Sequence, residues 1–195
     1  MLGMAVKAFV ISLAFLSLTV MAQNNSAATA GSPGCGDDAI KFSVKTDKGQ
    51  HPSQPETGKA LIYFIEDDSN FNSTPKPTTR AGLDGKWMGA THGNSYLSFS
   101  VDPGVHHLCA SWQSAGAHPL AGLLMGVSTG QDSKAAALHF TAEAGNTYYF
   151  KVRNIFFRAD SSSSTKIDLS LTPLDNDEGQ LLANKSAHST SAQKK

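Results

Sequence analysis

Short segments in which apolar and polar residues alternate recur between residues 38 and 171, and turn-forming residues separate them. In residues 40–44 the apolar members are Ile40, Phe42 and Val44, and residues 97–101 repeat the pattern. An alternation with a period of two places every second side chain on one face of a strand. The chain is therefore constrained to form sheets that each bury one face.

Other segments extend this pattern. Residues 59–66 form a nearly continuous apolar run, which predicts a central strand covered on both faces. Asp84-Gly85 suits a two-residue hairpin turn, and Asp102-Pro103-Gly104 suits a tight turn. Further strands are expected at 105–112, 135–143, 147–154 and 167–171. Many short strands with turns between them predict an all-β fold, an antiparallel β-sandwich over residues 37–173, with a small barrel as the alternative.

The pattern changes after Pro173. Asp175 and Glu178 are spaced as in a capping box, which predicts a short C-terminal helix over residues 174–187. The oxygen-rich run Asp175–Gly179 also invites comparison with a calcium loop, but such loops need a distant bidentate acid, so the helix start is preferred. The polar residues 188–195 are expected to be a disordered tail.

The N-terminus has the features of a secretory signal peptide over residues 1–22. Lys7 precedes an apolar run over residues 8–20, and Val20-Met21-Ala22 places small residues before a cleavage point near Ala22. An uncleaved membrane anchor is the alternative, although the apolar run is short for a span. The polar residues 23–36 then form a flexible lead-in. This arrangement predicts a periplasmic or secreted protein with no membrane span after cleavage.

Charge is balanced along the chain, with 16 basic and 16 acidic residues. A nucleic-acid partner would require a basic face, so none is expected. There is also no polybasic stretch for a membrane surface.

The two cysteines, Cys35 and Cys109, are predicted to form a disulfide, because an even number of cysteines favours pairing in an oxidising compartment. The bridge would close a loop of about 75 residues, which the chain-entropy model values at ~4 kcal/mol. Two buried free thiols are the alternative. Ser32-Pro33-Gly34 does not match a lipid-attachment motif, so lipidation of Cys35 is not expected.

Four motifs stand in an order that resembles the bacterial domain-of-unknown-function family numbered 2846: Gly58–Phe64, Leu83–Gly89, Tyr96–Leu108 and Ala142–Lys151. They span about half of the chain. The resemblance implies a short secreted protein or lipoprotein with a β-sandwich similar to transthyretin-like and carboxypeptidase-regulatory-like domains. It implies no activity, since the shared motifs specify turns and not a reaction.

No catalytic or metal-binding motif is found, and no cofactor is expected. His106 and His107 are neighbours on an expected strand and point to opposite faces, so they are poorly placed to share a metal ion. Glu66, Asp67 and Asp68 end a strand and are expected to be solvated. No serine lies in a nucleophile elbow. The remaining histidines weighed as ligands show no chelating spacing: His92, His118 and His139.

Two features are candidates for partner contact. The first is the apolar loop Pro119–Val127, which either forms an interaction surface or folds over an open end of the sandwich. Its candidate contact residues are Leu120, Leu123, Leu124 and Met125. The second is Tyr149, which is expected to face outward beside Lys151 as a platform for a sugar or a protein.

Two functions follow from these features. The first is an exported, non-enzymatic β-sandwich module that binds a protein or a polymer in the cell envelope. The alternative is a small secreted hydrolase or metal-dependent enzyme whose site is assembled from dispersed histidines and acids. The two differ in whether His92, His106 and His139 converge.

Overall fold

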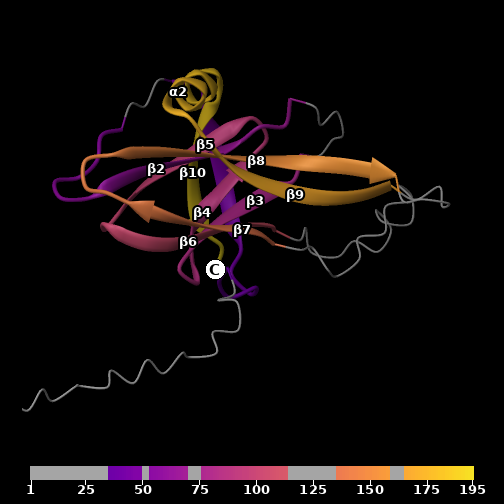
Figure 1. Cartoon of the computed structure of the whole chain (residues 1–195). Coiled ribbons are helices and arrows are strands. Elements are labelled where there is room, and N and C mark those ends of the chain that lie inside the picture. The colour runs from indigo at the N-terminus through magenta and orange to yellow at the C-terminus, as the bar shows by residue number, and fades with distance from the viewer. Residues whose placement is uncertain (1–34, 50–52, 70–75, 114–134, 159–164) are drawn as a thin grey trace, which may run out of the picture. The chain divides into compact units, whose positions relative to one another are not determined.

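The computed structural model describes residues 35–49, 53–69, 76–113, 135–158 and 165–195, all within the compact unit Gly31–Lys195. This part of the chain forms ten strands and one helix, and Figure 1 labels all of them except β1. In chain order they are β1 (Phe42–Asp47), β2 (Ala60–Glu66), β3 (Thr78–Leu83), β4 (Lys86–His92), β5 (Ser95–Val101), β6 (Gly104–Trp112), β7 (Ala136–Ala142), β8 (Thr147–Arg158), β9 (Thr165–Leu174), α2 (Asn176–Lys185) and β10 (Ala187–Gln193).

The strands form two sheets that pack face to face. Sheet A has the order β1-β10-β5-β2-β8-β9, and sheet B has the order β4-β3-β6-β7. Most neighbours are antiparallel, while β2–β8 and β10–β5 are parallel. The predicted all-β sandwich with a short C-terminal helix is confirmed.

The central strand β2 is covered on both faces, as its apolar run predicts. Ile62 and Phe64 point between the sheets and join the main core, whereas Leu61, Tyr63 and Ile65 point to the opposite face of sheet A. Every residue of β2 is buried. A strand that is hydrophobic on both faces needs a second layer on each side.

Helix α2 supplies the second layer. Asp175 caps its first turn by accepting a hydrogen bond from the Glu178 amide at 2.8 Å. Leu182 and Ala183 pack against the outward cluster of sheet A, and α2 contacts β8 and β2 (Figure 1). The predicted cap at Asp175 is therefore present, while the Glu178 carboxylate pairs with Lys151, and the helix lies on the sheet.

The prediction of a disordered tail over residues 188–195 is wrong, because residues 187–193 form β10. This strand pairs with β1 over its whole length and with the start of β5. Ser189 is 1% exposed, and its hydroxyl donates to Ser95 Oγ at 2.7 Å. Ser191 Oγ accepts from the Ala90 amide. A hydroxyl that finds an internal partner allows Ser189 to be buried in a strand that has no large apolar residue.

The predicted disulfide is confirmed: Cys35 and Cys109 are joined, with 5.7 Å between their Cα atoms. The end of the predicted lead-in, Cys35-Gly36, is thus held against sheet B, while residues 23–34 lie outside the described residues. The Trp87 indole donates to the Asp37 carbonyl at 2.8 Å. Arg80 lies over the Trp87 ring, 4.1 Å from its centroid.

Gly179 sets how closely α2 approaches sheet A. A Cβ at this position would lie 2.6 Å from Cδ2 of Tyr149 and closer still to two other atoms of that side chain. Helix propensity alone favours alanine over glycine by ~1 kcal/mol. We expect Gly179→Ala to lower the free energy of unfolding by about 2 kcal/mol instead, since overpacking outweighs propensity.

Chemical denaturation of the two proteins measures this difference. Leu181→Ala on the exposed side of the same helix is the control, because this side chain is 53% exposed and its loss should change stability by less than ~0.5 kcal/mol. A gain in stability in Gly179→Ala would show that the helix does not lie on Tyr149.

Candidate binding site

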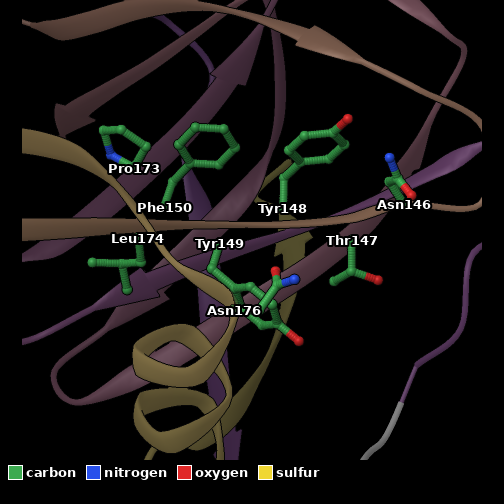
Figure 2. A pocket seen from close by; sticks show the side chains of 8 residues that line it. All are labelled: Asn146, Thr147, Tyr148, Tyr149, Phe150, Pro173, Leu174 and Asn176. Atoms are coloured by element: carbon green, nitrogen blue, oxygen red, sulfur yellow. The ribbon is translucent and has the colours of Figure 1, made fainter.

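A cavity of about 270 Å³ lies where β8 begins and β9 ends (Figure 2). Pairing between these strands starts at Tyr149 and Leu174, after which the chain leaves β9 for α2. The first two residues of β8, Thr147 and Tyr148, therefore lie beyond the end of that pairing. The cavity occupies this open end of the ladder, and its lining residues are Asn146, Thr147, Tyr148, Tyr149, Phe150, Pro173, Leu174 and Asn176.

The accessible lining combines apolar and amide side chains. Tyr148 is half-buried and Pro173 is exposed, and both project from the same face of the strands in Figure 2. Asn146 and Asn176 are exposed at the rim. Aromatic or aliphatic walls with a few placed hydrogen-bonding groups are typical of small-ligand sites.

The β7–β8 turn holds Tyr148 in place. Its hydroxyl accepts a hydrogen bond from the Glu143 amide at 3.0 Å, and its ring packs against Phe140. Asn146 Nδ2 donates to the Glu143 carboxylate at 3.0 Å. These contacts order one wall of the cavity before any ligand arrives.

The predicted outward platform at Tyr149 is not what the structure shows. The ring is 8% exposed and stacks on Tyr63, with 5.0 Å between centroids. Helix α2 covers it, because Gly179 leaves room for the ring. Burial accordingly raises the pKa of Tyr149. Tyr149 is nevertheless one of the residues that line the cavity.

The other candidate for partner contact was the loop Pro119–Val127, with Leu120, Leu123, Leu124 and Met125. This loop lies outside the described residues.

The expectation that Glu66, Asp67 and Asp68 are solvated is wrong. Their exposed fractions are 1%, 8% and 2%. Glu66 continues the inward alternation of Ile62 and Phe64, so its side chain enters the end of the space between the sheets. The polar character of these three residues led to the prediction that they are exposed. The inward direction of Glu66 nevertheless follows from the period of two along the strand.

Hydrogen bonds from several strands reach this acidic end of the sandwich. Thr79 donates to Glu66 Oε1 at 2.7 Å, and Asn154 donates to Asp68 Oδ1 at 2.6 Å. The Trp112 indole in turn donates to the side-chain oxygen Oδ1 of Asn154 at 2.8 Å. Glu66 Oε2 and Asp68 Oδ2 are buried without a hydrogen-bond partner among the described residues.

Burial and the neighbouring charge of Asp68 raise the pKa of Glu66 to about 8. Glu66 is therefore protonated at neutral pH, which avoids placing two bare carboxylates in a site with little solvent. Burial also raises the pKa of Asp68. Asp67 behaves differently: burial alone would raise its pKa, but hydrogen bonds from Arg153 and Ser69 outweigh this and lower it.

Among the described residues, His92, His106 and His139 do not converge in one site, and His118 lies outside the described residues. His92 Nδ1 contacts Thr78 Oγ1 at 3.3 Å beside the β3–β4 pairing. His106 lies against Asp84, with 2.7 Å between Nδ1 and Oδ2, and its Nε2 is 2.7 Å from the Asp102 carbonyl oxygen. Burial alone would lower the pKa of His106, but these two oxygens outweigh it and raise the pKa. His139 instead lies opposite His107 on the other face of sheet B.

No family model, curated protein or solved structure matches this chain. The resemblance to the family numbered 2846 stays a prediction.

Glu66 makes stability depend on pH in a direction opposite to that of most carboxyl groups. The folded protein holds this proton up to about pH 8, whereas the unfolded chain releases it near pH 4.5. Folding therefore takes up a proton between these values, and the free energy of unfolding falls as pH rises through this window. The full fall across this window should be on the order of 5 kcal/mol, at about 1.4 kcal/mol per pH unit.

Glu66→Gln should reduce this fall, because glutamine keeps the shape and stays neutral. Denaturation curves from pH 5 to pH 9 measure it. Asp67→Asn provides a control of opposite sign: the lowered pKa of Asp67 contributes stability that is lost only below about pH 4, so the cost of this variant should stay constant from pH 5 to pH 9 and shrink in further curves measured below pH 4. Parallel pH profiles for wild type and Glu66→Gln would contradict the assignment of a neutral Glu66.

Proposed function

We propose that this chain is an exported, non-enzymatic β-sandwich module that binds a protein or a polymer in the cell envelope. The observation that supports binding is the cavity beside Tyr148, where an aromatic ring, Pro173 and two rim amides surround an open strand end. These groups recognise a ligand by packing and hydrogen bonds, without a reactive side chain among them.

The size of the cavity favours one unit of a larger molecule. Its volume, about 270 Å³, is just below the roughly 300–1,000 Å³ of sites that enclose a drug-sized molecule. A single sugar ring or one peptide side chain fits this space, and the rest of the polymer would continue over the surface. Beyond the end of the β9 pairing, the Thr147 backbone, which faces away from β2, is placed to hydrogen-bond an extended ligand.

Export is the second part of the proposal. It is supported by the signal-like residues 1–22 and by the Cys35–Cys109 disulfide, which is typical of oxidising compartments. No helix among the described residues is long and apolar enough to cross a membrane. A periplasmic or secreted location with cleavage near Ala22 is proposed on these grounds.

Blocking the cavity tests the binding site. Asn176→Trp places a large side chain at the exposed rim, in the first turn of α2, without altering the core. Retention of the mature chain on purified peptidoglycan and on immobilised envelope proteins is measured for both proteins. We expect retention on at least one matrix and a reduction of fivefold or more in the variant.

Thr190→Trp on the exposed side of β10 is the matched control, since it adds the same ring away from the cavity. It should bind as the wild type does. The proposed site is contradicted if the wild-type protein is retained on neither matrix. It is also contradicted if Asn176→Trp is retained as well as the wild type.

A further inference from the structure

We propose that His107 and His139 together bind one transition-metal ion of the Zn²⁺, Cu²⁺ or Ni²⁺ type on the outer face of sheet B. Two observations carry this proposal: the cross-strand position of the two imidazoles and a buried nitrogen of His107. Neither belongs to the cavity at β8 or depends on the proposed binding function.

The two rings face each other across adjacent strands. His107 of β6 is directly opposite His139 of β7, and their ring centroids are 4.7 Å apart with 43° between the ring planes. Zinc–imidazole bonds of 2.0–2.1 Å place two nitrogens on a tetrahedral ion about 3.3 Å apart. Directly opposite strand residues bring their side chains within this range after small rotations.

One nitrogen of this pair lacks a partner. His107 is 9% exposed, and its Nδ1 is buried without a hydrogen bond to any described residue. Leaving a buried polar nitrogen unsatisfied costs roughly 1–3 kcal/mol. A coordinated metal ion would satisfy it, and imidazole is a preferred ligand of zinc, copper and nickel. His139 is exposed and provides the route for the ion.

The backbone around His107 is held in place. Its amide donates to Asp84 Oδ1 at 2.8 Å, and its carbonyl accepts from the Asp84 amide at 3.0 Å. Two residues further along, Cys109 is joined to Cys35. Restraints on the backbone that carries a ligand reduce the entropy lost on binding.

His92 and His106 differ in this respect. Both ring nitrogens of His106 already contact oxygens, and Nδ1 of His92 contacts Thr78. Nor does the described part of the chain contain three or more His, Cys, Asp or Glu residues grouped to hold a metal. A pair of histidines therefore leaves coordination positions open for water or a further ligand.

Calorimetric titration of tag-free mature protein with Zn²⁺, Cu²⁺ and Ni²⁺ tests the site. We expect one ion per chain for at least one metal, and at least tenfold weaker binding in His139→Ala. His139→Ala removes an exposed ring, so folding should be retained, and far-ultraviolet circular dichroism checks this. His92→Ala is the matched control and should bind like wild type.

Electron paramagnetic resonance of the Cu²⁺ complex counts the nitrogen ligands independently. Two coordinated nitrogens are expected in the wild type and one in His139→Ala. Equal affinity in His139→Ala and wild type, equal nitrogen counts, or the absence of one-to-one binding with all three metals would each overturn the proposal. The test does not use the cavity, so its failure leaves the proposed binding function untouched.

Discussion

The Cys35–Cys109 disulfide fixes the first described residues against the outer face of sheet B, and much of that face is organised around it. Gly82 makes the approach possible, because a Cβ there would lie 2.8 Å from Cys109 Sγ and nearer still to the Cys35 carbonyl oxygen. Beside the bridge, buried Arg80 donates to the Ile40 carbonyl at 3.1 Å and stacks on Trp87. The same bridge restrains β6 two residues beyond His107, so the proposed metal pair lies on a backbone that is held from both sides.

The interior of the sandwich is apolar along most of its length and polar at one end. Phe64 and Phe150 are fully enclosed in the main core, whereas Glu66 and Asp68 enter the same space through hydrogen bonds from Thr79 and Asn154. A protonated glutamic acid is compatible with such an environment, and an ionised pair is not. This end therefore gives the fold a stability that depends on pH, while the cavity at the start of β8 has no carboxyl, histidine, lysine or arginine side chain among its lining residues.

Local patterns were sufficient for most of the fold. The alternating segments, the Asp84-Gly85 turn and the Asp175 cap predicted strands, a hairpin and a helix that the structure contains. Predictions from these local patterns were wrong where the burial of a residue depends on partners that are distant in sequence. The serine-rich tail forms β10 by pairing with the distant strand β1, and Ser95 and the Ala90 amide satisfy two of its hydroxyls. The pairing of His107 with His139 likewise depends on the β6–β7 register, and Tyr149 is covered only because a glycine lies above it in α2.

The Cys35–Cys109 disulfide and the proposed export of the chain are tested most directly on the native protein. Intact mass and N-terminal sequence are measured after the protein is isolated from its producing cells and alkylated without reduction. We predict a chain that begins just after Ala22 and carries no alkylated cysteine, because Cys35 and Cys109 are joined. A chain that keeps residues 1–22, or that carries alkyl groups on both cysteines, would contradict the account.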